Sequence, residues 1–282
     1  MEGRVWMSVL EFLPEDQCSS GRFRYSERCI IMVVLWAVLH DRPIQWACQA
    51  EHWPRAFCPA RLPHASTVSR RARKPAVTAE LERVFQRTVA CLDDGGRYAA
   101  IDGRPLLVGG ASKDRDARPG RAVRGMGRGY KLHAVVDARH VTVAFSIRPM
   151  NEAEQTVAQE LMSIIPTRIR RIVGDTIYDS MPLHHAAGAS GRKLYTLLRQ
   201  NRVGRRQQKR RLQLHKLRQR KTGQRLFRWR DEIERTFGQA TTLSFGYKGL
   251  PAWARRTHRV FRWMWGKIVL HHAWLMRNRP AV

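Results

Sequence analysis

The stretch Tyr-Ala-Ala-Ile-Asp-Gly at residues 98–103 marks the place where the sequence changes from helical to strand-forming patterns. Apolar residues run up to a carboxylate and a glycine, which predicts a short strand ending at Asp102. Upstream, residues 1–94 carry patterns typical of helices, and Asp-Asp-Gly-Gly at 93–96 is typical of a linker. The sequence therefore predicts a boundary between a helical region, 1–94, and a second region, 95–282.

The helical region contains one strongly apolar segment. Residues 29–39 follow Ser26, and the proline of His-Asp-Arg-Pro at 40–43 disfavours helix in the residue before it. The segment is too short to span a bilayer and too far from the N-terminus to be a signal sequence, so we expect a buried helix. A short helix containing Trp46 and a longer one at 76–92 complete the region.

A basic helix is a further feature of this region. Ser66 is predicted to cap a helix that exposes Ser69, Arg70, Arg71 and Arg73. The pattern resembles the recognition element of a helix-turn-helix, which lies in the major groove of DNA. An ordinary solvated basic helix accounts for the same residues equally well.

Beyond the linker, the patterns favour an α/β arrangement. After the first strand we expect a Gly- and Arg-rich loop at 109–129, antiparallel strands at 130–137 and 141–147, a helix at 152–164, a strand at 169–173 ending at Gly174-Asp175, another helix, and a strand at 193–198. A helix across Glu234 and a long amphipathic helix at 253–277 follow. The predicted fold class is α/β, a mixed sheet with flanking helices, preceded by a small all-α region.

The charge of the chain points to a polyanionic partner. The formal net charge is +29, with 52 Lys and Arg against 23 Asp and Glu. Arginine binds phosphate through paired hydrogen bonds and stacks on bases, so we expect nucleic acid, bound with an affinity that falls steeply as salt rises. A hydrophobic content of 43% excludes general disorder.

Cysteine usage gives no sign of a disulfide framework. The five cysteines are Cys18, Cys29, Cys48, Cys58 and Cys91, which are widely spaced. None belongs to a Cys-x-x-Cys pair, so the sequence predicts reduced intracellular thiols rather than disulfides or a zinc site.

Carboxylates are almost absent from the last part of the chain. Residues 180–282 hold only three acidic side chains, all within 230–235. Acids kept inside such a cationic surface indicate a task that a cation cannot perform, such as metal binding. Residues 199–230 are basic and contain no acid. We expect them to form a surface on which DNA lies, or to be disordered until DNA binds.

Three carboxylates are expected to converge. Asp102 and Asp175 each end a predicted strand, where polar residues of an α/β sheet line the site crevice. Ile233 and Phe237, four residues apart, mark the buried stripe of a helix and place Glu234 at its edge. The three would repel one another without a divalent ion. Two Mg²⁺ ions, or Mn²⁺ in their place, suit oxygen ligands and phosphodiester chemistry.

These residues resemble the bacterial insertion-sequence transposases, which carry a DDE catalytic triad on an RNase H-like fold of the retroviral-integrase superfamily. The resemblance runs through HDRP (40–43), WAC (46–48), STVSRR (66–71), IDGRPL (101–106), SKDRDA (112–117), GYKLH (129–133), GD (174–175), YDS (178–180), IERTFG (233–238) and LPAW (250–253). It covers most of the chain in order and is therefore highly specific. It implies that Asp102, Asp175 and Glu234 are the catalytic and metal-binding triad.

The family pattern around its glutamate is Tyr-x2-Arg-x3-Glu-x6-Lys. Arg230 and Glu234 match this pattern in register, whereas Phe227 replaces the tyrosine and Thr241 replaces the lysine. The departures remove a hydroxyl contact and a DNA-phosphate contact but leave the metal ligands in place. Glu232 is the reserve candidate for the third carboxylate.

Other polar residues are candidates for DNA contact. They are Ser69, Arg70, Arg71, Arg121, Arg124, Lys131, Arg205, Arg206, Arg210, Arg211, Arg230 and Arg235. Asp114 and Asp116 are expected to organise the arginines of their loop, or else to help place DNA. Asp137 is expected in a turn, and Tyr178 in the core.

The predicted function is that of a DNA transposase. Residues 1–94 would bind the terminal inverted repeats, and 95–282 would form the RNase H-like catalytic domain with a basic insertion at about 199–224. The expected partners are terminal-repeat DNA, target DNA and further copies of the chain, in the bacterial cytoplasm at the nucleoid and not at a membrane. Two alternatives stay open: an RNase H-like nuclease without strand transfer, and a non-catalytic DNA-binding relative of a transposase.

Overall fold

The structure is a computed structural model of the chain, and it describes residues 2–15, 24–197, 213–214, 216–247 and 249–278. The chain divides into two compact units. The first comprises Met1–Leu92 and Ala240–Val282, and the second comprises Asp93–Gln239.

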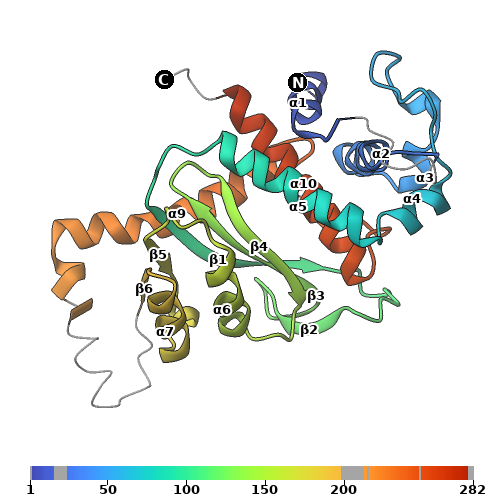
Figure 1. Cartoon of the computed structure of the whole chain (residues 1–282). Helices are drawn as coiled ribbons and strands as arrows, with labels where there is room; N and C mark the ends of the chain where they lie inside the picture. The colour runs from blue at the N-terminus through green and yellow to red at the C-terminus, as the bar shows by residue number, and fades with distance from the viewer. Residues whose placement is uncertain (1, 16–23, 198–212, 215, 248, 279–282) are drawn as a thin grey trace. The chain divides into compact units, whose positions relative to one another are not determined.

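The first unit is built from helices (Figure 1). They are α1 (Glu2–Phe12), α2 (Glu27–Leu39), α3 (Ile44–Ala47), the 3₁₀ turn η1 (Ala50–His52), α4 (Ala65–Arg71), α5 (Pro75–Cys91) and α10 (Thr257–Asn278). Helix α2 begins after Ser26, whose side chain accepts a hydrogen bond from the Cys29 N–H, as a cap at this position requires. The predicted apolar helix, the short helix at Trp46 and the longer helix after it are confirmed.

The C-terminal helix α10 belongs to this unit. It packs against α1, α2 and α5. Gly266 allows the close approach of α2, because a Cβ there would lie 3.0 Å from Val38 Cγ1. The sequence prediction placed residues 240–282 with the catalytic domain, and within the described residues α10 packs with the N-terminal helices. The reason is the apolar stripe of α10, which is buried against those helices.

Helix α4 differs from its prediction in two respects. Its cap is His64, whose Nδ1 accepts the Ser66 N–H at 3.3 Å, rather than Ser66 itself. Arg71 does not lie on the exposed face, because it shares the buried face of the helix with Val68, three residues earlier. Its guanidinium donates to Glu27 Oε1 at 2.8 Å.

The second unit is organised around a mixed sheet. Its strands are β1 (Tyr98–Leu107), β2 (Arg118–Arg121), β3 (Met126–Asp137), β4 (Thr142–Pro149), β5 (Arg171–Gly174) and β6 (Lys193–Thr196). The order is β2-β3-β1-β5-β6, with β4 paired to β3. Strands β1, β3 and β4 are antiparallel neighbours, whereas β5 runs parallel to β1 and β6 parallel to β5. The predicted fold class is confirmed.

Two parts of this sheet extend further than predicted. Strand β1 does not end at Asp102 but continues to Leu107, because it pairs with β3 along almost its whole length. The expected loop at 109–129 contains β2 and the beginning of β3. Gly129 lies so close to the Leu106 backbone that no side chain would fit, which lets the two strands pair there.

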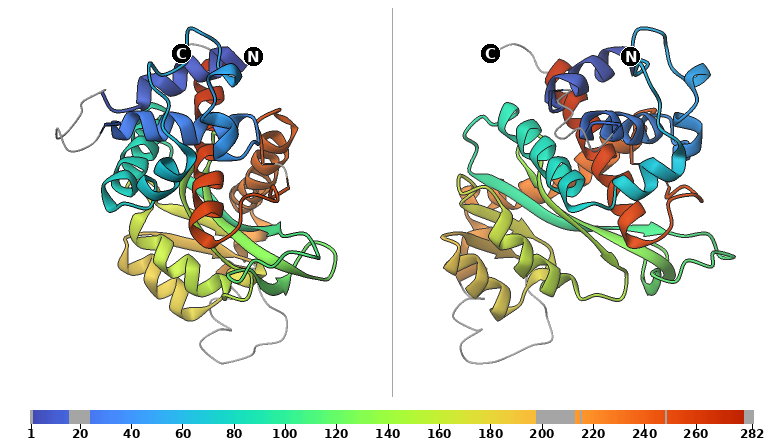
Figure 2. Two further views of the ribbon diagram at one scale, coloured as in Figure 1. Left: turned by 90° about the vertical axis from the view of Figure 1, so that its right-hand side faces the viewer. Right: turned by 45° about the vertical axis from the view of Figure 1, so that its right-hand side comes forward.

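Helices cover both faces of the sheet. Helices α6 (Glu154–Ile164) and α7 (Met181–Ala189) pack together over the strands, as Figure 2 shows, and the 3₁₀ turn η2 (Thr176–Tyr178) precedes α7. Helix α9 (Lys221–Thr242) contacts the face that carries Arg104, whose Nη1 donates to the Phe237 carbonyl at 3.2 Å. Ile233 and Phe237 are buried, as their spacing predicted.

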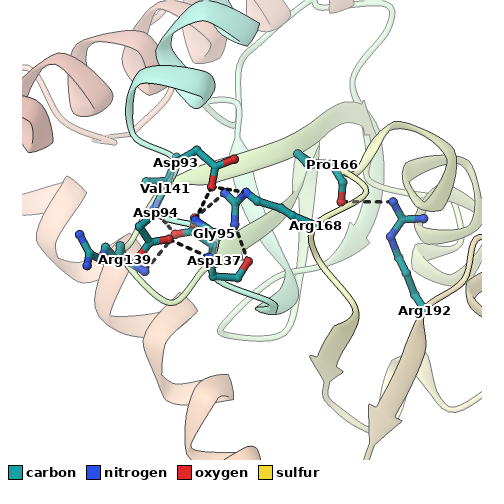
Figure 3. Close-up of polar contacts among 10 residues, drawn as sticks. Asp93, Asp94, Gly95, Asp137, Arg139, Val141, Pro166, Arg168 and Arg192 are labelled. Atoms are coloured by element: carbon teal, nitrogen blue, oxygen red, sulfur yellow. Dashed lines mark hydrogen bonds and ion pairs between the residues drawn. The ribbon is translucent and has the colours of Figure 1, made fainter.

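Ion pairs fasten the beginning of the second unit (Figure 3). Arg168 bridges Asp93 and Asp137 at 2.7 and 2.9 Å, and Arg139 pairs with Asp94. Asp137 also accepts hydrogen bonds from backbone N–H groups of the turn between β3 and β4. This confirms the predicted place of Asp137 in a turn.

Two further expectations concern the chain as a whole. Among the residues that the structure describes, no helix is long and apolar enough to cross a bilayer. Among the described residues, Cys29, Cys48, Cys58 and Cys91 are not joined by disulfides, and Cys18 lies outside the described residues.

Candidate active site

Asp102 and Asp175 are brought together by the parallel pairing of β1 and β5. The ladder ends with Ala100 opposite Val173, and continuing it by two residues sets Asp102 level with Asp175. Asp175 directly follows β5, as predicted. Asp102 instead lies within β1, at the point where its parallel partner has ended. Both side chains are half-buried at this edge of the sheet.

Both aspartates have a raised pKa. The pKa of Asp102 is raised to about 6, chiefly by burial and then by the carboxylates of Asp175, Glu154 and Glu234, against the hydrogen bond from the Gly103 N–H. Burial, followed by the charge of Glu154, also raises the pKa of Asp175, against hydrogen bonds from backbone N–H groups. A proton or a cation placed among these groups relieves their repulsion.

Local backbone bonds orient each aspartate. Asp175 caps the turn η2, and its Oδ1 accepts the Ile177 N–H at 2.8 Å. Asp102 Oδ1 accepts the N–H of the next residue, Gly103, at 2.7 Å. The two carboxylates are therefore held by segments that end at the same edge.

Glu234 lies on α9 within electrostatic reach of Asp102. Its side chain is 61% exposed, and Arg230 Nη2 lies 3.5 Å from its Oε1. Glu232 is less exposed, at 19%, and its Oε2 lies 3.8 Å from His140 Nε2. The arrangement favours Glu234 over Glu232 as the third carboxylate, because the charge of Glu234 helps to raise the pKa of Asp102, whereas Glu232 lies beside His140 and pairs with Arg235.

A fourth carboxylate, Glu154, lies at the same edge and was not singled out from the sequence. It is the first residue of α6, and its Oε1 lies 2.7 Å from Lys131 Nζ. The hydroxyl of Tyr178 donates to its Oε2 at 3.2 Å. A glutamate in the first turn of a helix is favoured by the helix dipole alone, so its position in the sequence carried no specific signal.

The donor set suits a hard divalent cation. Asp102, Asp175 and Glu234 offer only oxygen atoms, which Mg²⁺ and Mn²⁺ prefer, and a bound cation would reverse the raised pKa of both aspartates. Within the described ranges, no three His, Cys, Asp or Glu side chains converge closely enough to hold a metal ion. The two aspartates fit as ligands, and Glu234 would have to approach them.

The predicted DNA contacts have different surroundings. The exposed or half-exposed members are Ser69, Arg70, Arg121, Arg124, Arg230 and Arg235. Arg71 and Lys131 are only 5% and 7% exposed and are paired with Glu27 and Glu154, which leaves little of either side chain accessible to DNA. The positions of Arg205, Arg206, Arg210 and Arg211 lie outside the described residues.

The Gly- and Arg-rich segment is organised by one buried acid. Asp114 is 2% exposed, and its Oδ2 accepts the hydroxyl of Tyr130 at 2.8 Å. Arg128 donates to the carbonyls of Ser112 and Ala117 at 2.8 and 3.2 Å. Asp114 therefore has a structural role, in which its partner is Tyr130, a residue that was not predicted to contact it.

The opposite ends of the parallel strands gather cations that the sequence did not single out. Tyr98, Arg171 and Lys193 are neighbours in the ladder, and the Arg97 carbonyl accepts the N–H groups of Arg170 and Arg171. All four basic side chains are exposed. The Arg171 guanidinium lies 5.1 Å above the ring of Tyr98, which orients it. Carboxylates at the start of this unit pair with other arginines (Figure 3).

Comparison with known proteins bears on this arrangement. The family described as transposase DDE domain matches residues 94–271. Among solved structures, the chain is similar to a piggyBac transposase synaptic complex with hairpin DNA, at 11% identity over 98% of this chain and 71% of that chain, with a TM-score of 0.47. It is also similar to a simian T-cell lymphotropic virus intasome in complex with the PP2A regulatory subunit B56 gamma, at 14% identity over 74% and 67% of the two chains, with a TM-score of 0.25.

Both structural likenesses are distant. Comparison with curated proteins gives no match. The family match, in contrast, covers more than half of the chain and includes Asp102, Asp175 and Glu234. It confirms the resemblance seen in the sequence motifs: the chain belongs to the transposase DDE domain family.

Proposed function

We propose that the protein is the DNA transposase of a bacterial insertion sequence, which binds terminal inverted repeats and catalyses metal-dependent strand cleavage and strand transfer. The observation that carries this proposal is the convergence of Asp102 and Asp175 at one sheet edge, with Glu234 within electrostatic reach. Membership of the transposase DDE domain family supports it. The protein would act in the cytoplasm on nucleoid DNA.

Asp102, Asp175 and Glu234 would hold two Mg²⁺ ions, for which Mn²⁺ can substitute. When bound, such ions activate an attacking oxygen and stabilise the departing one. The chain itself supplies orientation, since backbone bonds at Gly103 and Ile177 fix the two aspartates. It also supplies affinity, because the crowded carboxylates repel one another until a cation is bound.

The reaction would proceed in two stages at the same site. Water attacks the phosphodiester at the element's end, the P–O bond to the 3′-oxygen breaks, and a 3′-hydroxyl is released. That hydroxyl then attacks a phosphodiester of target DNA, so that one P–O bond forms as another breaks. Neither stage requires a covalent intermediate with the protein.

Exposed cations would hold the DNA. Arg121 and Arg124 lie on and beside β2, and Arg230 and Arg235 lie on α9 next to Glu234. Contacts of this kind position the phosphate backbone without reading its sequence. Recognition of the terminal repeats would fall to the first unit, whose helix α4 exposes Arg70. Synapsis of two ends implies that further copies of the chain assemble on DNA.

A strand-transfer assay tests the proposal. The wild-type chain with Mg²⁺ should cut labelled end DNA and should join pre-cut ends to a target plasmid. Asp102→Asn and Asp175→Asn should lose both reactions and retain DNA binding. Cleavage without joined product would identify a nuclease instead. Unchanged cellular function in Asp102→Ala, Asp175→Ala and Glu234→Ala variants would identify a non-catalytic DNA-binding protein.

A further inference from the structure

Glu154 connects the two segments that carry the aspartates. Its side chain is 14% exposed, and its Oε1 lies 2.7 Å from Lys131 Nζ on β3, the strand next to β1. Its Oε2 accepts the hydroxyl of Tyr178 at 3.2 Å. Tyr178 is fully buried and closes the turn that Asp175 caps. The carboxylate of Glu154 therefore links strand β3 of the sheet to the turn η2, which Asp175 caps.

The glycines beside the aspartates show how tightly this space is filled. Gly103 follows Asp102, and a Cβ at this position would lie 2.6 Å from Glu154 Oε2. Gly174 precedes Asp175, and a Cβ there would lie 2.9 Å from Tyr178 Cδ2. Neither position has room for a side chain while Glu154 and Tyr178 keep their places. The backbone next to Asp102 therefore packs against Glu154, and the backbone next to Asp175 packs against Tyr178.

The residues that hold these segments lie on the face of the sheet opposite to the carboxylate of Asp102. Lys131 pairs with Pro105 across β1 and β3, and Pro105 faces away from Asp102 because side chains alternate along a strand. Gln155 adds a second tie between α6 and the turn, since its Nε2 donates to the Ile177 carbonyl at 2.6 Å. These groups hold the segments that bear the aspartates and lie away from the face on which Asp102 presents its carboxylate.

We propose that Lys131, Glu154 and Tyr178 form a positioning network that sets the separation and orientation of Asp102 and Asp175. This inference rests on the proposed function of that site. Glu154 is the centre of the network, because it alone contacts both other members. Lys131 balances its charge, so that a fourth carboxylate can lie beside the aspartates. The Tyr178 hydroxyl links that carboxylate to the turn.

Stability alone is a poor explanation for such a pair. Burying two charges is costly, and replacing a buried ion pair by apolar residues of similar volume is often neutral or stabilising. Residues that orient metal-binding carboxylates from outside, in contrast, typically change metal affinity or activity ten- to a hundredfold. The network therefore predicts a loss of function that exceeds the loss of stability.

Two double variants isolate the positioning role. Lys131→Met/Glu154→Gln and Lys131→Met/Glu154→Met both remove the charge pair at similar volume, but only glutamine keeps an acceptor for the Tyr178 hydroxyl. The Met/Met variant removes the acceptor of a buried hydroxyl and should have the lower Tm, so Mn²⁺ affinity is compared at a temperature at which both variants are folded. Mn²⁺ affinity, measured by calorimetry on the DNA-free protein, should be about tenfold lower in the Met/Met variant than in the Met/Gln variant. The kcat of cleavage should follow Mn²⁺ affinity, with the DNA Kd unchanged.

Tyr178→Phe removes only the hydroxyl and should lower Mn²⁺ affinity as the Met/Met variant does. Glu160→Gln, on the same helix but with a side chain 53% exposed, is the control and should change neither affinity nor kcat. Equal Mn²⁺ affinity in the two double variants would overturn the network. If both lost affinity equally while Tyr178→Phe kept it, Glu154 would be a metal ligand and not a positioning residue.

The proposed function can fail separately. A wild-type chain that binds Mn²⁺ but neither cuts nor joins DNA would overturn the transposase proposal, and Mn²⁺ affinity would still test the network. A wild-type chain that cuts DNA, with all three variants as active as it is, would overturn the network alone. A wild-type chain that binds no Mn²⁺ would overturn both.

Discussion

The two ends of the parallel strands carry side chains of opposite charge. At the carboxyl end, Asp102 and Asp175 lie half-buried, and at the amino end Arg171 and Lys193 lie exposed as ladder neighbours. The length of β5 separates Arg171 from Asp175 by about 13 Å along the strand. Each end gathers like charges, so each is suited to a ligand of opposite charge. A divalent cation suits the first and phosphate groups suit the second.

Burial makes the difference between the two ends. At the acidic end the surroundings are poor in water, which strengthens the repulsion among carboxylates and raises the pKa of both aspartates. At the basic end the side chains are open to solvent and salt, which screen them. Changes at the acidic end should therefore alter the chemistry strongly, and changes at the basic end should alter DNA binding modestly and in a salt-dependent way.

Removing one charge at the acidic end should have the largest effect. Asp175→Asn keeps the side-chain volume and an acceptor for the Ile177 N–H but loses the charge that a metal requires. Strand cleavage should fall roughly a thousandfold, since metal catalysis contributes several kcal/mol. Single-turnover cleavage of labelled end DNA measures this loss. Asp231→Asn on the exposed surface of α9 is the matched control. Near-normal cleavage by Asp175→Asn would contradict the expected difference between the acidic and basic ends of the strands.

The next largest effect should come from Glu234, and it should distinguish this residue from Glu232 on the same helix. Glu234→Gln should lower cleavage roughly a hundredfold, because the proposed metal centre loses its third carboxylate. Glu232→Gln should keep cleavage nearly intact and lower the free energy of unfolding by about 0.2–1 kcal/mol, as expected for an ion pair at the surface. Cleavage rates and thermal unfolding of both variants provide the test. The opposite order of cleavage rates would assign the third position to Glu232.

The raised pKa of Asp102 predicts a pH dependence. The folded chain keeps this proton up to about pH 6, whereas an unperturbed aspartate loses it near 3.8. The metal-free fold should therefore lose stability as pH rises from about 4 to about 6. Mn²⁺ affinity should rise about tenfold per pH unit below pH 6, because the ion displaces one proton. Calorimetry at pH 5, 6 and 7 measures this, and a flat profile would contradict the assigned burial.

Changes at the basic end should have the smallest effect. Arg171→Gln/Lys193→Gln should weaken DNA binding about tenfold and lower the slope of log affinity against log salt by about 2, at roughly 0.9 per lost phosphate contact. Cleavage at saturating DNA should stay unchanged. The control is Arg83→Gln/Arg148→Gln, which removes the same charge from arginines that already have carboxylate partners. Equal slopes in the two double variants would mean that only net charge matters.

Local patterns predicted the elements that depend on neighbouring residues. The apolar helix after Ser26, its end before Pro43 and the buried stripe of Ile233 and Phe237 all follow from backbone rules and helical periodicity, and the structure contains each of them. The same rules could not find the full length of β1. Its continuation beyond Asp102 depends on pairing with β3, which is remote in the sequence until the sheet forms.

The candidate site shows the same division. Asp102, Asp175 and Glu234 stood out because of their positions in strands, a helix and family motifs. Glu154 did not, since only its partners Lys131 and Tyr178, distant along the chain, make it part of the site. Lys131 was expected at the surface for the same reason, because a basic residue on a strand does not reveal which face will be covered.

By itself, the sequence determined the excess of positive charge, the helical and strand-forming segments, and the motifs of the transposase family. The tertiary structure alone decided that β5 lies beside β1 and sets Asp175 level with Asp102. It also decided that Glu154 and Tyr178 fill the space beneath them, and that α10 packs with the N-terminal helices. Periodicity and charge are properties of neighbouring residues, whereas the proximity of carboxylates and the burial of a charge depend on segments that only folding brings together.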